Sequence, residues 1–365
     1  MLDLPLIEAK GDAATRGRHY GEQARARIHR GIEHYTQQIA SYGLTQAALR
    51  ELARSFVPQI TAFDADYLPE MEGIAAGANV DLGDIILLNA RTELLQIARA
   101  EAKAKGALPE DDPDGCTGLI VMPEASANGR LIHAQNWDWK VECAETAVVL
   151  KLTETGGPDI LTFVEAGQLA RSGMNSAGIA ITANYLECER DYKTVGVPLA
   201  FLRRKVLQQS HLAPALHAAA VTPKSASNNI MISQADGFGI DFECAPDESF
   251  ILRPEAGVIV HANHWNSPVA LSKLRDTGLN STPDSLYRDT RVRQILGNAP
   301  IDRDRVKEAL FDDWQSPHAV CRPPRPGSKG NLTATVAMIV MEPASGEMEV
   351  SLLPALNKDF HRFTL

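Results

Sequence analysis

The sequence predicts an α+β fold in which helices and strands form separate layers, and three observations carry this prediction. The hydrophobic spacing is helical up to about residue 115, and strand-like segments dominate after that point. Asn128-Gly129 and Asp236-Gly237 separate consecutive strand segments, which is typical of antiparallel hairpins. Runs of strands combined with separate groups of helices favour a layered α+β architecture over a doubly wound parallel sheet.

The N-terminal part of the chain is predicted to be helical. Residues 13–40 place apolar and aromatic positions among many charges, as in an amphipathic surface helix, and residues 45–63 and 66–78 continue this pattern. Residues 84–100 begin with an aspartate and are more apolar, which indicates a more buried helix. Residues 101–115 contain two prolines, two glycines and five acidic residues, so we expect an exposed loop there.

The remaining elements are mostly strands of seven to ten residues. Alternating or continuous apolar runs bounded by turn residues indicate these strands, and longer segments with helical spacing interrupt them. Strands are predicted at 117–123, 130–136, 146–153, 159–166, 178–184, 228–234, 238–244, 257–263, 332–341 and 347–354, and helices at 198–220, 285–297 and 302–311.

Composition narrows the class of protein. The 365 residues include 36 Lys and Arg against 46 Asp and Glu, a net charge of −10, which argues against nucleic acid or an anionic membrane as the main partner. We find no membrane-spanning apolar run, no signal peptide and no dinucleotide-binding motif, so we expect a cytoplasmic protein that needs no cofactor. The cysteines are well separated and form no CxxC pair, which favours a reducing environment without disulfides; they are Cys116, Cys143, Cys188, Cys244 and Cys321.

Cys116 follows Gly115 at the point where the acidic loop ends and the first strong strand begins. Glycine leaves the carbonyl that the thiol could attack free of side-chain bulk. If the bond between the two residues were cut, Cys116 would carry an α-amine with a pKa of about 7.7–8.0, able to act as the base for its own thiol. The alternative is a loop cysteine without a role. The other four cysteines are expected to be small core residues.

Two further segments contain candidate catalytic residues. Asp138 lies between Trp137 and Trp139 in a strand, where a carboxylate needs a partner, although it could also form an Asx turn at the hairpin end. Asn263 follows a strand in His261-Ala262-Asn263-His264-Trp265, where its amide could act as an oxyanion donor. The two histidines lack a third His or a carboxylate nearby, so we expect no metal site.

Together these segments resemble the acyl-coenzyme A:6-aminopenicillanic acid acyltransferase (isopenicillin N acyltransferase) family. The motifs occur in the family's order between about residue 5 and about residue 355. They are Asn89-Ala90-Arg91-Thr92-Glu93, DGCT around Cys116, QNWDW around Asp138, EAG at 165–167, NSAG at 175–178, GVP at 196–198 and HANH at 261–264.

The resemblance implies a single domain with the four-layer αββα fold of N-terminal nucleophile (Ntn) hydrolases. It also implies self-cleavage between Gly115 and Cys116 into a mostly helical α chain, residues 1–115, and a β chain, residues 116–365, which stay associated as partners. The substrate would be a small amide, such as an N-acyl amine, a peptide-like compound or a lactam.

The family's site residues carry over as follows. Cys116 matches the nucleophile that forms an acyl-enzyme, Asp138 the aspartate that holds and polarises its α-amine, and Asn263 the oxyanion asparagine. A second oxyanion asparagine of the related bile-salt hydrolases corresponds to Asn184.

One position departs from the family pattern. Lys329 stands where the penicillin enzymes have an arginine, so the charge is kept but the bidentate fork is lost. This puts penicillin-type carboxylate contacts in doubt. Trp137, Trp139 and Tyr185 are expected either to line an apolar acyl or aryl pocket or to be core aromatics.

Several alternatives remain open. Hydrolysis is expected rather than acyl-CoA-dependent transfer of the penicillin-biosynthesis type, because no Lys/Arg cluster for the coenzyme phosphates is visible near the motifs. An unprocessed thiol hydrolase could instead use a Cys–His pair with His261 or His264 as the base. A scaffold or binding protein that kept the fold without catalysis is the remaining class.

Overall fold

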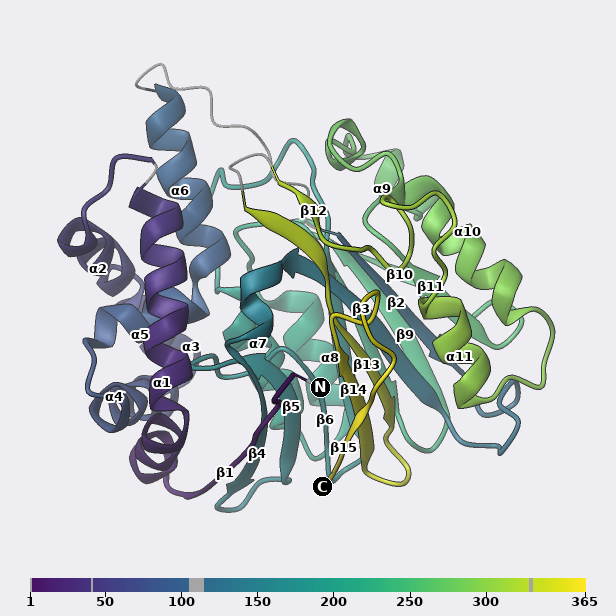
Figure 1. Ribbon diagram of the computed structural model, residues 1–365, viewed down its shortest axis with the longest axis horizontal. Coiled ribbons are helices and arrows are strands. Elements are labelled where there is room, and N and C mark those ends of the chain that lie inside the picture. Colours follow the sequence, from purple (N-terminus) through teal and green to yellow (C-terminus); the bar gives the residue numbers. More distant parts are fainter. Residues whose placement is uncertain (1, 41, 105–114, 328–330) are drawn as a thin grey trace.

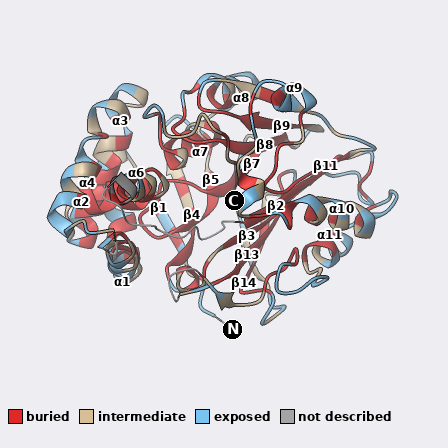
Figure 2. Cartoon of the chain, turned by 90° about the horizontal axis from the view of Figure 1, so that it is seen from above, coloured by how far each residue is buried: buried red, intermediate tan, exposed pale blue. Residues whose placement is uncertain are grey.

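Two β-sheets face each other at the centre of the computed structural model, which describes residues 2–40, 42–104, 115–327 and 331–365. Helices cover the outer face of each sheet, so the order of layers is helix, sheet, sheet, helix (Figure 1). The central strands are almost entirely buried and the outward faces of the helices are exposed (Figure 2). The α+β prediction and the four-layer arrangement are therefore confirmed.

The first sheet has eight strands among the described residues, in the order β1-β4-β5-β6-β7-β8-β9-β10. All neighbours are antiparallel except the β1/β4 pair, which is parallel. The strands are β1 Leu6–Gly11, β4 Ala147–Glu154, β5 Ile160–Glu165, β6 Ser172–Asn175, β7 Ile179–Tyr185, β8 Asn228–Gln234, β9 Phe238–Cys244 and β10 Ser249–Leu252.

The second sheet has seven strands among the described residues, in the order β11-β2-β3-β13-β14-β15, with β12 paired to β13. All pairs are antiparallel. This sheet packs against the first through β2, β3, β11 and β13. The strands are β2 Gly115–Val121, β3 Ile132–Lys140, β11 Val258–His261, β12 Arg325–Pro326, β13 Leu332–Glu342, β14 Glu347–Leu352 and β15 His361–Thr364.

The helices divide between the two outer faces. The eight-stranded sheet is covered by α1 Ala13–Ala40, α4 Tyr67–Ala78, α5 Leu82–Asn89, α6 Arg91–Ala104, α7 Leu199–Leu207 and α8 Leu212–Val221, with α2 Gln46–Arg54 and α3 Val57–Phe63 packed outside them. The seven-stranded sheet is covered by α10 Ser285–Leu296 and α11 Arg303–Leu310; the short elements are α9 Pro268–Leu271, η1 Val141–Ala144 and η2 Gly278–Asn280.

Most predicted elements are present, with four kinds of correction. The N-terminal part is not purely helical, because β1 pairs with β4, and the segments 84–100 and 198–220 each contain two helices, not one. The expected loop 101–115 is helical to residue 104 and becomes a strand at residue 115; its middle lies outside the described residues. The short strands β6, β10, β12 and β15 were not predicted.

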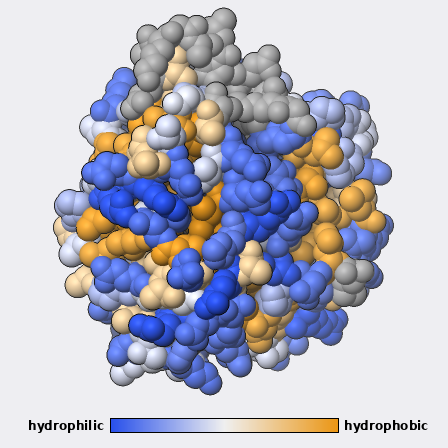
Figure 3. All heavy atoms as spheres, turned by 60° about the vertical axis from the view of Figure 1, so that its left-hand side comes forward, coloured by the Kyte–Doolittle hydropathy of each residue, from blue (hydrophilic) through white to orange (hydrophobic). Residues whose placement is uncertain are grey.

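The surface formed by the N-terminal helices is mixed. Hydrophilic residues are spread over this face, with hydrophobic residues gathered in smaller patches between them (Figure 3). This distribution fits α1, where a stripe of buried positions from Tyr20 to Ile39 alternates with exposed charged residues. Among the described helices, none combines the length and apolar character that a transmembrane segment requires.

Candidate active site

The three predicted catalytic residues lie on, or directly after, neighbouring strands of the seven-stranded sheet. Gly115 and Cys116 begin β2, and in the β2/β3 ladder Gly115 pairs with Asp138. On the other side of β2, β11 ends with His261 opposite residue 118, and Asn263 follows two residues later. The antiparallel register therefore brings residues far apart in the chain to one end of the sheet.

The backbone nitrogen of Cys116 already has a defined acceptor. It donates to Asn263 Oδ1 at 2.8 Å, and the Asn263 amide donates in turn to the Tyr185 carbonyl at 2.8 Å. Cys116 is only 2% exposed. In the uncut chain, Asn263 Oδ1 thus accepts a hydrogen bond from the nitrogen that would become the α-amine of Cys116. One N–H group of the Asn263 amide is already used by the Tyr185 carbonyl. Its role as an oxyanion donor stays a prediction.

Asp138 lies beside the residue that precedes the cysteine. Its Oδ1 accepts the Thr335 hydroxyl at 2.6 Å, and its Oδ2 lies 3.1 Å from Arg322 Nε. Burial raises the pKa of the Asp138 carboxyl, and the positive charges of Arg322 and Arg288 oppose this shift. The carboxylate is therefore buried with a hydrogen-bond donor and a cation, not placed in an Asx turn at a hairpin end.

Gly115 is required by close packing. A Cβ at this position would lie 2.6 Å from Arg322 Nη1 and 2.7 Å from Asp138 Oδ2, which is shorter than a van der Waals contact. The sequence pointed to glycine for the accessibility of its carbonyl. The structure adds that a Cβ at this position would force the Arg322 guanidinium or the Asp138 carboxylate to shift.

Two buried arginines at the site were missed from the sequence. Arg288 Nη1 donates to the Cys116 carbonyl at 2.6 Å, and its Nη2 donates to Asn263 Oδ1 at 2.7 Å. Asp284 accepts from Arg288 Nε at 2.8 Å and also from Arg322. Burial works against the charge of Asp284, but the two arginines hold its pKa below the usual range. The i,i+4 spacing of Asp284 and Arg288 at a predicted helix start was the one available signal.

Lys329, the expected replacement for the family arginine, lies outside the described residues. The arginine found beside Asp138 and Gly115 is Arg322, which precedes β12 and β13. A buried guanidinium that contacts both Asp138 and Asp284 is therefore present at the site despite the lysine at position 329.

Asn184 lies close to the site but has its hydrogen-bonding groups engaged. Its Nδ2 donates to the carbonyls of His261 and Ala262 at 2.9 and 3.0 Å, and its Oδ1 accepts from Gln135 at 2.8 Å. It therefore links β7 of one sheet to the end of β11 in the other. An oxyanion role would require Asn184 to release one of these carbonyls.

The three candidate pocket aromatics occupy different places. Tyr185 lines a cavity of about 40 Å³ that also contains Cys116. Trp137 is fully buried with Arg171 Cζ 3.9 Å from its ring centre, and Trp139 has Arg91 Cζ at 4.7 Å. The two tryptophans therefore pack under guanidinium groups, and neither contributes to the lining of this cavity as far as the structure describes it.

The same cavity overturns the expectation that no basic cluster lies near the motifs. Arg91, Arg171 and Arg203 all line it together with Cys116 and Glu93. They come from α6, the start of β6 and α7, so they are separated by up to 112 positions in sequence, from 91 to 203. A cluster assembled in this way cannot be seen by scanning the sequence for neighbouring charges.

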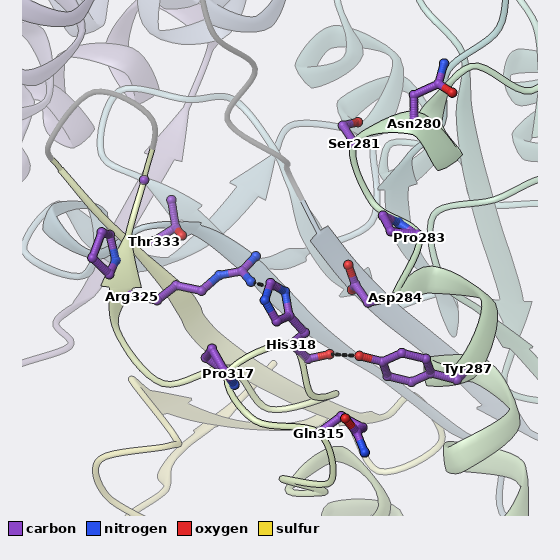
Figure 4. Close-up of a pocket in the computed structure, with 12 residues that line it drawn as sticks. Asn280, Ser281, Pro283, Asp284, Tyr287, Gln315, Pro317, His318, Arg325 and Thr333 are labelled. Atoms are coloured by element: carbon purple, nitrogen blue, oxygen red, sulfur yellow. Dashed lines mark hydrogen bonds between the residues drawn. The ribbon is translucent and has the colours of Figure 1, made fainter.

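A larger cavity of about 760 Å³ has Asp284 in its wall (Figure 4). Arg325 points at His318, with Nη1 and Nδ1 2.5 Å apart, and the Tyr287 hydroxyl donates to the His318 carbonyl at 2.8 Å. Asp284 forms part of the wall and also accepts from Arg288, which donates to the Cys116 carbonyl. The cavity is large enough for a small-molecule ligand.

The two histidines near the site have partners other than the thiol. His261 Nε2 lies 2.7 Å from Glu243 and its Nδ1 lies 3.0 Å from the Ala262 carbonyl. Burial alone would lower the pKa of His261, but Asp241 and Glu243 raise it to about 9, so the ring is protonated at neutral pH and cannot serve as a base. His264 Nδ1 contacts Ser285 at 2.8 Å.

The other sites expected from the sequence can also be placed. Cys143, Cys188, Cys244 and Cys321 are all buried, as expected of core residues. Across the described part of the chain, no three His, Cys, Asp or Glu side chains are grouped so that they could hold a metal ion.

Comparison with known proteins points to the same family that the sequence motifs resemble. The family model described as acyl-coenzyme A:6-aminopenicillanic acid acyl-transferase matches residues 125–353, a segment that includes Asp138 and Asn263 and begins after Cys116. The 40 kDa form of acyl-coenzyme A:6-aminopenicillanic-acid-acyltransferase from Emericella nidulans is 28% identical over 341 residues, covering 90% of this chain and 87% of that protein.

Two solved structures are similar at lower identity. A mutant of the conjugated bile acid hydrolase from Clostridium perfringens is 14% identical, covers 68% of this chain and 92% of its own, and has a TM-score of 0.45. Penicillin V acylase from Agrobacterium tumefaciens is 17% identical, covers 68% of this chain and 86% of its own, and has a TM-score of 0.44.

Proposed function

Because the chain belongs to the acyl-coenzyme A:6-aminopenicillanic acid acyl-transferase family, an acyltransferase and acylase family of Ntn hydrolases, we propose that it is a self-processing cysteine amidohydrolase. It cleaves a small amide, such as an N-acyl amine, a peptide-like compound or a lactam, through an acyl-enzyme on Cys116. The observation that carries this proposal is the setting of the Gly115–Cys116 bond between Asn263, Asp138 and Arg322.

The first step is self-cleavage. The Cys116 thiol adds to the Gly115 carbonyl carbon, the C–N bond breaks, and the nitrogen leaves with a proton as the α-amine of Cys116. Water then hydrolyses the thioester, giving the Gly115 carboxylate and the free thiol. The Arg322 guanidinium lies where a Gly115 side chain would be, so it is placed to stabilise the oxyanion that forms on this carbonyl. The products would be residues 1–115 and 116–365.

The second step is acyl transfer to the thiol. After cleavage, the α-amine of Cys116 would retain the Asn263 Oδ1 acceptor that the amide N–H uses in the uncut chain. An α-amine has a pKa of about 7.7–8.0, so it can take the thiol proton near neutral pH and pass it to the leaving amine. Asp138 would hold the protonated amine through its charge. Water completes the cycle by hydrolysing the acyl-enzyme.

The cavity of about 760 Å³ beside Asp284 is the proposed site for the larger part of the substrate. Its wall reaches the Cys116 carbonyl through a single residue, Arg288. Pockets of about 300–1,000 Å³ are typical of small-molecule sites, which supports a small amide over a protein substrate.

Transfer to an amine acceptor is the second candidate function. One observation favours it, because the Emericella nidulans relative is an acyltransferase and matches 90% of this chain. The acyl donor would then be an amide or a coenzyme A thioester, and an amine would replace water in attacking the acyl-enzyme. Acyl donors supplied with and without an amine acceptor distinguish the two: turnover that requires the acceptor would favour transfer.

Intact mass spectrometry tests the proposed processing directly. The purified protein should contain two fragments that stay together under native conditions, with Cys116 at the N-terminus of the larger one. Cys116→Ala should remain one inactive chain, and the matched control Cys244→Ala, at another buried cysteine, should be processed. A wild-type protein found only at full length would refute self-cleavage and favour an unprocessed thiol enzyme.

A further inference from the structure

The small cavity that contains Cys116 is lined by three buried arginines. Arg91, Arg171 and Arg203 are 5, 6 and 9% exposed, and they approach the cavity from α6, from the residue before β6 and from α7. Burying a guanidinium group is costly unless a counter-charge or hydrogen-bond acceptors compensate for it. The partners of each arginine therefore indicate what this cavity can bind.

Arg91 and Arg171 are held in place by protein groups. Arg91 Nε forms an ion pair with Glu165 at 3.1 Å, and its guanidinium stacks on Trp139. The guanidinium carbon of Arg171 lies 3.9 Å from the ring centre of Trp137, a close cation–π contact. Both groups are thereby fixed in position at the cavity wall.

Arg203 differs from the other two. Its guanidinium forms no hydrogen bond or ion pair with any residue that the structure describes, and its buried Nε lacks an acceptor. Burial, together with the charges of Arg171 and Arg91, lowers the pKa of Arg203 to about 9, so the group remains charged at neutral pH. A buried cation without a partner favours binding of an anion.

The carboxylates around the cavity do not neutralise the three arginines. Glu165 pairs with Arg91, and Glu93 is the only acidic residue among the described residues that line the cavity. Burial raises the pKa of Glu93, which disfavours its charged form. Even with both carboxylates ionised, three cations against two anions leave one positive charge in excess beside the thiol.

We propose that Arg203, with Arg171 beside it, binds an anionic group of the substrate next to the Cys116 thiol, and that this group is a carboxylate. The inference rests on the proposed function in one respect, namely that Cys116 is the nucleophile. The cavity volume of about 40 Å³ corresponds to space for a few water molecules, since one water needs about 10–15 Å³ of such volume. A carboxylate fits a space of this size, whereas the nucleotide part of coenzyme A does not.

Alkylation of Cys116 by a matched pair of reagents tests the subsite without any knowledge of the substrate. Iodoacetate and iodoacetamide have nearly the same shape, but only iodoacetate carries a negative charge. Their rates at Cys116 are followed by mass spectrometry of the peptide that contains it and are compared with their rates at glutathione. We expect the ratio of the iodoacetate rate to the iodoacetamide rate to exceed that of glutathione about 10- to 100-fold, since hydrogen bonds to charged groups have this strength.

Variants connect the preference to one side chain. Arg203→Met should lower the ratio to that of glutathione, Arg203→Lys should keep part of the preference because it keeps the charge, and the control Arg18→Met, at an exposed position, should leave it unchanged. Malonate should protect wild-type Cys116 from iodoacetate. If Arg203→Met does not fold, the proposal is tested instead by the reduced preference expected for Arg203→Lys and by the protection expected from malonate. A wild-type ratio equal to that of glutathione, a preference that survives Arg203→Met, or failure of either reagent to reach Cys116 would overturn the proposal.

Turnover experiments separate the carboxylate from a phosphate source and from the proposed function itself. A glutaryl anilide should have a kcat/KM at least tenfold above that of the uncharged valeryl anilide, and Arg203→Met should reduce the ratio of the two values to about one. Competition by coenzyme A that is stronger than that by glutarate would assign the subsite to a phosphate and overturn the carboxylate. Absence of any amide turnover, with the alkylation preference intact, would refute the proposed function and leave the anion subsite supported.

Discussion

Replacing Gly115 by alanine tests the geometry of the cleavage site with a single methyl group. The added Cβ would lie 2.6 Å from Arg322 Nη1 and 2.7 Å from Asp138 Oδ2. Ordinary contacts of a Cβ with heavy atoms begin at about 3.4 Å, so the guanidinium or the carboxylate must move by nearly 1 Å. Arg322 and Asp138 are themselves held by an ion pair and by Thr335, which limits how far they can yield.

The cost can be estimated from overpacking in buried sites. Inserting a methyl group into a closely packed region costs about 1–3 kcal/mol. If relief of this strain in the uncut chain moves the carbonyl away from the thiol, so that the reactive arrangement costs this much more than the resting one, cleavage of the bond slows by about 5- to 150-fold, because each 1.4 kcal/mol is about tenfold in rate. An alanine does not change the chemistry of the bond itself, so the effect isolates the position of the neighbouring side chains.

The assay is the conversion of full-length Gly115→Ala to two fragments, followed by intact mass spectrometry after purification of the uncut chain. Gly157→Ala serves as the control, because its Cβ would meet only the Glu154 side chain at 3.4 Å. Processing of Gly115→Ala at the wild-type rate would refute the idea that Arg322 and Asp138 are fixed against Gly115.

Three further predictions concern charge and hydrogen bonding at the site. Since burial raises the pKa of Asp138, its carboxyl should titrate with a midpoint above about 4, the ordinary aspartate value; a lower midpoint in an NMR titration of the labelled carboxyl carbons, assigned with Asp138→Asn, would contradict this. Asp241 and Glu243 raise the pKa of His261 to about 9, so its contribution to the free energy of unfolding is fully present below about pH 6.5 and is lost as the pH rises through 9. Urea unfolding of His261→Gln should therefore show a larger destabilisation at pH 6 than at pH 9.5, and equal values at both would contradict the pairing. Asn263→Ala should lower kcat by about 10²- to 10³-fold if its amide stabilises the oxyanion, and a loss under tenfold in steady-state kinetics would exclude that role.

The sequence was most informative where one local pattern determines geometry. The strands at 228–234 and 238–244 are found with the predicted bounds, because Asp236-Gly237 fixes the turn between two apolar runs. Cys116 and Asp138 do lie on neighbouring strands, as two consecutive predicted strands imply. The connection from residue 122 to residue 131 is longer than a two-residue turn at Asn128-Gly129, so the register that places Asp138 opposite residue 115 could not be predicted from that turn.

The sequence was least informative about buried charge. Arg203 and Arg204 lie on α7 and read as polar positions of a surface helix, yet both are buried: Arg204 bonds to Glu70 and Glu154, and Arg203 faces the Cys116 cavity. A guanidinium on a helix looks the same in a sequence whether it is solvated or buried, because its partners come from other elements. Arg322 was missed for the same reason.

The pairing of β1 with β4 has a consequence for the protein after the proposed cleavage. This strand lies before residue 115, but its hydrogen-bonded neighbour β4 lies after it, so cutting the chain breaks no bond of the eight-stranded sheet. The two pieces would share one core and unfold in a single cooperative transition, without dissociating on dilution. Each mature molecule would keep the N-terminal segment with which it was translated, and exchange of that segment between molecules would require complete unfolding.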